Sequence, residues 1–314
     1  MIKRALVLSG GGSRGSFQVG MIRSIVEKYN INFDVIYGVS VGALNGSFIA
    51  QADKQKPDDL LYYASKLEER WKKIKNNDDI YNSRSFLSIV LKNHNSYYDN
   101  KNLYKLINKW IDVDKIKKSG TKLRIGVVSL LSGDFYNMSE DCNNLIDYIF
   151  ASTCIPGVFS PQKIFNDMYV DGGIRNITPL KEAIQNETVD EIYVLLTNRI
   201  KLQENGEIDV INIPICIKDL TSKFLGTPEI IKVISRAVDI MCTEILINDI
   251  NITSKKNKES IVNKKYRNVP IYIISPKKCY GNNDNGLDFS KELISEAIDH
   301  GKIVGEDKST WNIL

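Results

Sequence analysis

Two glycine-rich turns near the N-terminus carry residues whose types and spacing could do chemistry. The second, Gly38-Val39-Ser40-Val41-Gly42, lies between an apolar run at 33–39 and a helical pattern at 41–52. This is the G-x-S-x-G arrangement, in which flanking glycines permit a sharp strand-to-helix turn that projects the serine hydroxyl. The amino end of the following helix also favours a developing negative charge. Ser40 is therefore a candidate nucleophile, and a glycine-lined packing turn is the structural alternative.

The first turn, Gly10-Gly11-Gly12-Ser13-Arg14-Gly15, follows an apolar run at 3–9 and precedes a helical pattern at 16–29. Consecutive glycines expose backbone N–H groups, which form an anion site together with the helix amino end. The pattern matches G-x-G-x-x-G, so a dinucleotide pyrophosphate is one candidate ligand. It is no Walker loop, because Ser16 stands where the lysine should be. A dinucleotide site also needs an acidic residue at the end of the second strand. Asp34 lies at about the right distance along the chain, but near the start of that strand.

A serine nucleophile needs a base, and the chain has two histidines. His94 lies in a polar segment that predicts an exposed loop. His300 lies near the end of a predicted helix before Gly301, where a histidine is commonly a solvated C-terminal residue. The order Ser40, Asp171, His300 suits an α/β-hydrolase triad, which leaves His300 as an alternative base. Ser40 nevertheless follows only the second strand, earlier than that fold places its nucleophile.

Asp171 is the other candidate base. It begins Asp171-Gly172-Gly173, directly after a short apolar run at 168–170. An aspartate at a strand end followed by glycines can point into a cleft, although the same tripeptide is also an ordinary turn. The stretch before it, 151–161 (ASTCIPGVFSP), contains Pro156, which stops the helical pattern predicted at 142–153.

Four segments together resemble the patatin-like phospholipases in order and spacing: 9–15, 38–42, 151–161 and 171–173. The resemblance covers residues 4–197 and implies a three-layer α/β/α fold with a mainly parallel central sheet and helical elaborations. It also implies a catalytic dyad without histidine. In that dyad Ser40 is the nucleophile and Asp171 is its hydrogen-bonded base.

The same resemblance assigns the oxyanion hole to the first glycine turn, namely to Gly10, Gly11, Gly12 and Arg14. Preorganised N–H donors beside a nucleophile are usually the largest single contribution to catalysis of acyl transfer. The remaining motif positions are expected to support the two turns and the base: Gly15, Gly38, Gly42, Pro156, Gly172 and Gly173. Ser9 stands where plant patatins have aspartate, a mild departure from the family pattern.

The whole chain, residues 1–314, is predicted to form one domain with a motif-bearing core at about 4–197 and a helical C-terminal portion at about 200–314. Two strand–helix units at the N-terminus favour a parallel sheet covered by helices. Further elements are predicted as a polar-faced helical segment at 58–110, long helical periodicity at 220–252, and strands at 123–129, 133–138, 191–197 and 270–275.

Composition excludes several classes of protein. Forty-two Lys and Arg against 38 Asp and Glu leave a net charge of +4, too weak to indicate nucleic acid as the main partner. The five cysteines and two histidines have no metal-ligand or CxxC spacing, so no metal or cofactor is expected. The uncharged run at 35–52 is rich in glycine and polar residues and predicts a buried strand–turn–helix. We therefore expect a soluble, cytoplasmic protein, with delivery to a host without a cleaved signal left open.

The sequence thus predicts a serine acyl hydrolase that cleaves phospholipids or lysophospholipids through an acyl-enzyme. Two alternatives remain at this stage: a triad esterase that uses His300, and a non-catalytic dinucleotide- or lipid-binding module on the glycine loop. Residues 254–267 carry six Lys and Arg against Glu259 alone. We expect a solvated loop there, with peripheral contact with anionic membranes as the functional alternative.

Two binding measurements separate the enzyme from the dinucleotide module. We expect a fluorophosphonate probe to label the protein, because only an activated serine reacts, and calorimetry to detect no binding of NAD. Micromolar NAD binding without labelling would establish the dinucleotide module instead.

Overall fold

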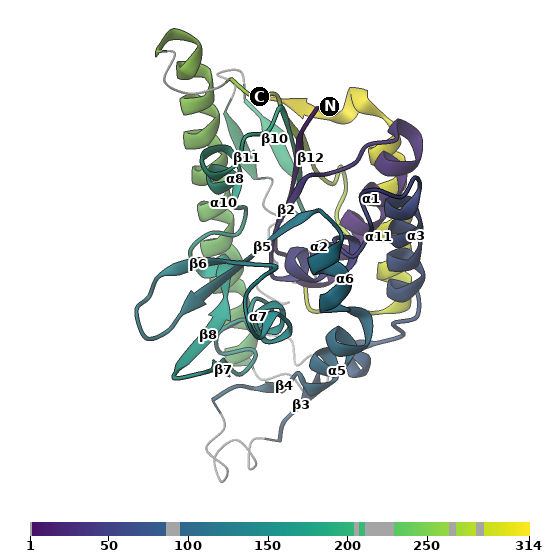
Figure 1. The fold of residues 1–314 in the computed structure, drawn as a ribbon. Helices are drawn as coiled ribbons and strands as arrows, with labels where there is room; N and C mark the ends of the chain where they lie inside the picture. Colours follow the sequence, from purple (N-terminus) through teal and green to yellow (C-terminus); the bar gives the residue numbers. More distant parts are fainter. Residues whose placement is uncertain (1, 86–94, 204–206, 211–228, 264–267, 281–285) are drawn as a thin grey trace.

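The computed structural model describes residues 2–85, 95–203, 207–210, 229–263, 268–280 and 286–314. Its centre is a nine-stranded sheet in the order β13-β12-β9-β1-β2-β5-β8-β7, with β6 paired to β5 (Figure 1). The parallel strands are β1 (Arg4–Leu8), β2 (Val35–Val39), β5 (Lys122–Ser129), β9 (Glu191–Leu195) and β12 (Ile271–Ile274). The antiparallel strands are β6 (Phe135–Ser139), β7 (Gln162–Ile164), β8 (Asp167–Asp171) and β13 (Asn312–Ile313). The sheet is therefore mainly parallel at its centre and mixed at its edges.

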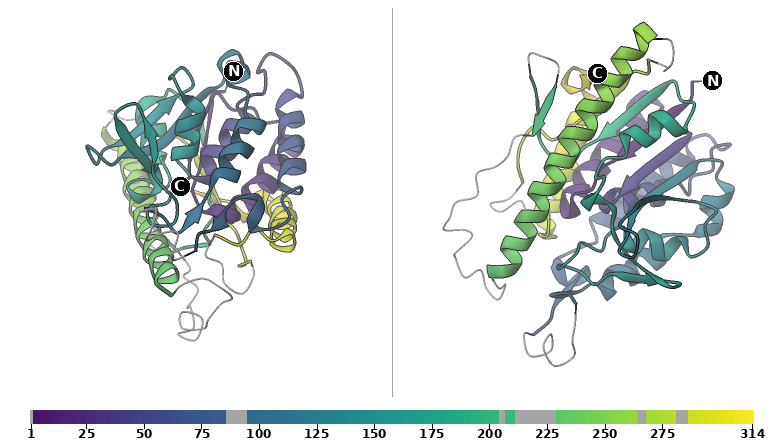
Figure 2. Two further views of the ribbon diagram at one scale, coloured as in Figure 1. Left: turned by 90° about the horizontal axis from the view of Figure 1, so that it is seen from below. Right: turned by 90° about the vertical axis from the view of Figure 1, so that its left-hand side faces the viewer.

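Helices cover both faces of this sheet, as Figure 2 shows, so the fold has three layers. One face packs against α1 (Gly15–Tyr29), α2 (Val41–Ile49), α3 (Asp59–Trp71), α5 (Lys101–Trp110), α7 (Leu145–Ala151) and α11 (Lys291–Glu306). The other face packs against α8 (Leu180–Asn186) and the long α10 (Glu229–Asn263). The other described elements are a short helix, α6 (Val113–Lys118), and two antiparallel strand pairs, β3 (Asn82–Ser83) with β4 (Tyr98–Asp99) and β10 (Ile200–Leu202) with β11 (Ile208–Val210). The described residues also form four single-turn 3₁₀ helices, at Gly12–Arg14, Asn77–Asp79, Gly172–Ile174 and Lys308–Thr310.

Strand β1 shows why the central strands are apolar throughout. Its side chains alternate between the faces, with Leu6 and Leu8 in one core and Ala5 and Val7 in the other. A strand buried on both faces has no polar side, so it is a continuous apolar run rather than an alternating one. Because β1 and β2 are parallel neighbours, the turns that follow them emerge at the same edge of the sheet. The fold therefore brings the two glycine-rich turns together.

The contact between α1 and α11 corrects the helix end expected at Gly301. Helix α11 continues through Gly301 to Glu306. A side chain at this position would place its Cβ 2.2 Å from the Phe17 carbonyl oxygen of α1. Gly20 of α1 is equally constrained, because its Cβ would lie 2.0 Å from the Ile298 carbonyl oxygen. These glycines let the two helices approach closely and do not terminate α11.

Two other expectations differ from the structure. The segment 58–110 is not a continuous helical region, because the β3–β4 hairpin separates α3 from α5. In the basic segment, residues 254–263 continue α10 instead of forming a loop, and 264–267 lie outside the described residues. The C-terminal portion also supplies β12 and β13 to the sheet, and the single-domain division stays a prediction. Among the described helices, none is long and apolar enough to cross a membrane.

Replacing Gly301 with alanine tests the close contact between α1 and α11. In an exposed helix this change would stabilise by about 1 kcal/mol through helix propensity. Here the new Cβ would collide with a backbone oxygen, so we expect the free energy of unfolding in urea to fall by about 1–3 kcal/mol. Asp299→Ala, at an exposed position of the same helix, should change it by less than about 0.5 kcal/mol. A more stable Gly301→Ala protein would show that the helices do not approach closely.

Candidate active site

Ser40 occupies a sharp turn between β2 and α2. Its backbone has φ 56° and ψ −127°, a strained conformation for a residue with a side chain. Gly38 and Gly42 make the turn possible, because a Cβ at Gly38 would lie 2.4 Å from the Gly42 carbonyl oxygen and one at Gly42 2.3 Å from that of Leu8. The strain turns the Ser40 side chain out of the strand and into a cavity. This is the geometry of a nucleophile elbow.

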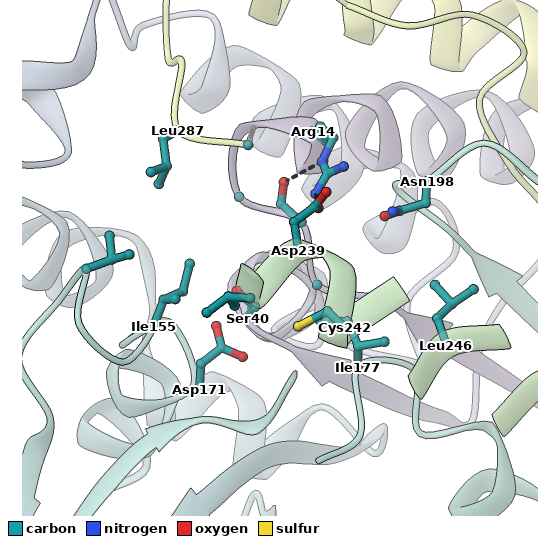
Figure 3. Close-up of a pocket in the computed structure, with 16 residues that line it drawn as sticks. Arg14, Ser40, Ile155, Asp171, Ile177, Asn198, Asp239, Cys242, Leu246 and Leu287 are labelled. Atoms are coloured by element: carbon teal, nitrogen blue, oxygen red, sulfur yellow. Dashed lines mark hydrogen bonds and ion pairs between the residues drawn. The ribbon is translucent and has the colours of Figure 1, made fainter. Parts of the chain in front are cut away.

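Asp171 lies beside Ser40 at the end of β8, where its carboxyl group points toward the serine (Figure 3). Ser40 and Asp171 both line the same cavity, and Ser40 is close enough to Asp171 to lower the pKa of its carboxyl group. The Gly173 N–H donates a second hydrogen bond to Asp171 Oδ1 at 2.8 Å. Both residues are buried, with Asp171 only 4% exposed. The structure thus brings together the two residues that the sequence singled out 131 positions apart.

Burial dominates the protonation of this carboxyl group. Removal from water disfavours the charged form and raises the pKa of Asp171 to about 7, although Ser40 and the hydrogen bond from Gly173 act in the opposite direction. A carboxylate with a pKa near neutrality can accept a proton and return it under ordinary conditions, as a general base requires.

Ser152 supports the elbow, although no motif in the sequence assigns it a role of its own. Its Oγ accepts a hydrogen bond from the Ser40 N–H at 2.9 Å and donates one to the Gly126 carbonyl oxygen at 2.7 Å. It thereby links the turn after β2 to the neighbouring strand β5. In the sequence, the only indication of this role is that Ser152 lies in the 151–161 stretch.

Two hydrogen bonds fix the peptide groups of the glycine loop. The Thr197 hydroxyl donates to the Gly10 carbonyl oxygen, and Arg14 Nε donates to the Gly11 carbonyl oxygen at 3.2 Å. In a trans peptide the N–H points opposite to the C=O. The N–H of Gly11 therefore points away from Thr197, and that of Gly12 points away from the Arg14 side chain. No acceptor in the described part of the chain takes up either N–H group.

The other N–H groups of this loop have partners within the protein. The Gly10 N–H donates to the Ile177 carbonyl oxygen at 3.2 Å. The Ser13 N–H donates to the Gly286 carbonyl oxygen at 2.8 Å, so a protein carbonyl occupies the position before α1 where an anion would otherwise bind. Two donors, on Gly11 and Gly12, therefore remain for a ligand.

An ion pair ties the loop to α10. Arg14 Nη2 lies 3.0 Å from Asp239 Oδ1, and the other oxygen of Asp239 is held by Arg236 at 2.8 Å. Arg14 and Asp239 are mostly buried, with side-chain exposures of 12% and 18%. Arg14 is therefore committed to holding α10 and the Gly11 carbonyl, and acts on the loop by positioning it.

A chain of buried amides lies beneath both turns. Trp71 Nε1–H donates to Asn45 Oδ1 at 2.9 Å, and Asn45 Nδ2 donates to Gln18 Oε1 at 3.2 Å. Gln18 Nε2 in turn donates to the carbonyl oxygens of Ser9 and Leu195. These bonds join α3, α2 and α1 to the ends of β1 and β9. They fix the elbow and the glycine loop relative to each other.

His300 lies apart from this site. Its Nδ1 is hydrogen-bonded to the Tyr280 hydroxyl at 2.7 Å, and its ring packs against Phe17 with centroids 5.3 Å apart. Burial lowers the pKa of His300. It does not line the cavity around Ser40, and His94 lies outside the described residues. Within the described ranges, no three His, Cys, Asp or Glu side chains are grouped to hold a metal ion.

The family model for patatin-like phospholipases matches residues 6–184, more than half of the chain. The chain belongs to the patatin-like phospholipase family. Among curated proteins, it is 50% identical over 46 residues to lysophospholipase nte1 of Aspergillus terreus, which is 15% of this chain and 3% of that protein. It is 23% identical over 222 residues to triacylglycerol lipase 4 of Saccharomyces cerevisiae, which is 62% of this chain and 24% of that protein. The matches thus span less than a quarter of these relatives.

Among solved structures, VipD from Legionella pneumophila aligns with 100% of this chain and 68% of its own. The TM-score is 0.41 and the sequence identity is 13%.

The buried Asp171 makes stability depend on pH in a defined direction. From about pH 4 the unfolded carboxyl ionises, while the folded one stays protonated until about pH 7, so the free energy of unfolding falls across this window. A pKa raised from 3.8 to about 7 corresponds to about 4 kcal/mol. Asp171→Asn cannot ionise at this position. We therefore expect its free energy of unfolding in urea, relative to that of the parent, to rise by roughly this amount between pH 4 and pH 8.

Asp299→Asn, at an exposed position, serves as the matched control and should follow the parent at each pH. If the curves of Asp171→Asn and the parent stayed parallel across this window, the carboxyl would be ionised in the folded protein already at low pH.

Proposed function

We propose that this protein is a serine acyl hydrolase that cleaves fatty-acyl esters of phospholipids or lysophospholipids. The observation that carries the proposal is the buried pair of Ser40 and Asp171, which line one cavity at a strained elbow. Beside them are two N–H donors that no acceptor among the described residues takes up. Membership in the patatin-like phospholipase family supports the class of substrate.

In the first half-reaction the Asp171 carboxylate takes the Ser40 hydroxyl proton as Oγ attacks the ester carbonyl carbon. The carbonyl oxygen becomes an oxyanion, which the N–H groups of Gly11 and Gly12 stabilise by hydrogen bonds. When the tetrahedral intermediate collapses, the bond to the alcohol oxygen breaks and Asp171 returns the proton to that oxygen. The products are a free alcohol and an acyl-enzyme on Ser40.

Water completes the second half-reaction at the same groups. Asp171 takes a proton from the water, whose oxygen attacks the acyl carbon, and the same N–H donors stabilise the second oxyanion. Collapse breaks the bond to Ser40 Oγ, which recovers the proton from Asp171, and a fatty acid leaves. One carboxyl group can serve both half-reactions because its pKa lies close to neutrality.

The geometry gives less support to the two alternatives. A triad would need His300 beside Asp171, but its Nδ1 is bonded to Tyr280 outside the cavity. A pyrophosphate would need the N–H groups at the start of α1, where Ser13 already donates to Gly286. The carbonyl of a substrate ester needs only the two donors that remain.

The lysines of the basic segment are poorly placed to hold the site at a membrane. Lys255, Lys256 and Lys258 are exposed on α10. Their neighbour Asn257 donates a hydrogen bond to the backbone carbonyl of Val269, two residues before β12 begins at Ile271. Ser40 lies at the opposite edge of the sheet, after the carboxyl end of β2. Contact with anionic membranes through this segment stays a prediction.

Single substitutions test the dyad. Ser40→Ala and Asp171→Asn should each lower the hydrolysis of a lysophospholipid by several orders of magnitude, because the members of a catalytic unit fail together. His300→Ala, outside the cavity, should retain most activity. The measurement is fatty-acid release by the parent and the three variants, after each variant has been shown to be folded. If His300→Ala were as inactive as Ser40→Ala, the dyad would be replaced by a triad.

A further inference from the structure

A second cavity meets the first at Ser40. The first is bounded by α10 and contains the polar side chains of Arg14, Asn198 and Asp239 (Figure 3). The second is narrow and lies between α2, α3 and α5. Its wall is almost wholly apolar and includes Leu44, Trp71, Leu103, Leu106, Trp110 and Phe289. Ser40 therefore stands where a cavity that includes a few polar side chains joins one that is almost wholly apolar.

This division matches the two sides of an ester bond. On one side of the reacting carbonyl is an acyl chain without polar atoms, and on the other is an alcohol with hydroxyl or phosphate groups. A buried apolar wall favours the chain by about fourfold for each methylene removed from water. It provides a phosphate group with no hydrogen bonds to replace those that the group loses with its hydration water. We infer that the cavity between α2, α3 and α5 binds the acyl chain, and that Trp110 at its far end sets the chain length fully accommodated.

The depth of the cavity is inferred from α2, whose Val41 and Leu44 line it, and from Trp110, which also lines it. Leu44 lies one turn beyond Ser40, and the ring of Phe48, one turn further, packs edge-on against Trp110 at 6.1 Å. Eight residues of helix rise about 12 Å. Three bonds of an extended chain span about 3.5 Å, so this depth holds about ten carbon–carbon bonds. The cavity therefore suits medium-length acyl chains best, and a longer chain must bend or leave its end outside.

The end wall is held in place by the backbone. Gln51 Nε2 donates to the Trp110 carbonyl oxygen at 3.2 Å, and Gln51 Oε1 accepts from the Asp112 N–H at 3.0 Å. The Trp110 side chain is only 8% exposed and packs against α2. These bonds fix the backbone at Trp110, and its ring can turn aside only by giving up its packing against Phe48.

The inference rests on the proposed function, and a series of p-nitrophenyl esters tests it. The catalytic efficiency of the parent should rise from butyrate through octanoate to dodecanoate and gain nothing further with palmitate. Leu106→Trp places a larger ring in the cavity from a half-buried position. It should lower the ratio of dodecanoate to butyrate efficiency at least tenfold.

Leu61→Trp is the matched control, because Leu61 is a half-buried leucine on α3 that does not line the cavity. It should keep the parent ratio. Trp110→Leu opens the far end and should raise the ratio of palmitate to dodecanoate efficiency, which gives the test in the opposite direction if Leu106→Trp does not fold.

The outcomes separate this inference from the function on which it rests. If the parent hydrolyses butyrate and reacts with a fluorophosphonate, but Leu106→Trp and Trp110→Leu keep its chain-length profile, the acyl site lies elsewhere and the hydrolase remains. If the parent neither reacts with the probe nor hydrolyses any ester, the proposed function fails and the acyl site fails with it.

Discussion

A carboxyl group buried beside a strained serine is the constraint on which the rest of this site depends. Asp171 is removed from water and can ionise only if the protein supplies hydrogen bonds to replace those it loses. The Gly173 N–H supplies one, and the nearby Ser40 also favours the ionised form. Because these are few, the pKa stays near neutrality, and the carboxyl can both take and return a proton. The burial of the Asp171 carboxyl thus accounts both for the proton transfer proposed for it and for its cost in stability.

The fold satisfies this constraint through the order of its strands. Strand β5 lies between β2, which leads into Ser40, and the antiparallel β8, which ends at Asp171. Gly172 allows the chain after β8 to pass close to β5, since a Cβ there would lie 2.6 Å from the Gly126 carbonyl oxygen. The same carbonyl accepts a bond from Ser152, which also holds the Ser40 N–H. Asp171, Ser40 and the elbow are therefore positioned from one point of β5.

Much of this arrangement could be predicted from the sequence, because its signals are local. Apolar runs and glycine turns identify β1, β2 and the helices that follow them, and the turns place Gly11 and Ser40 at one sheet edge. The course of α11 beyond Gly301 could not be predicted, because it depends on a close approach to α1. Nor could the β3–β4 hairpin, whose Tyr81 and Tyr98 rings pack against each other in a region of helical pattern. Such contacts exist only between segments distant in sequence.

The pH dependence of Ser40 labelling tests the central claim most directly. The rate of fluorophosphonate attachment, followed by intact mass, should rise with pH around a midpoint near 7, where the Asp171 carboxyl ionises. His300→Ala should show the same midpoint and nearly the same rate. Asp171→Asn should react far more slowly at every pH. Loss of labelling in His300→Ala, or labelling of Asp171→Asn at the parent rate, would contradict a dyad in which Asp171 is the base.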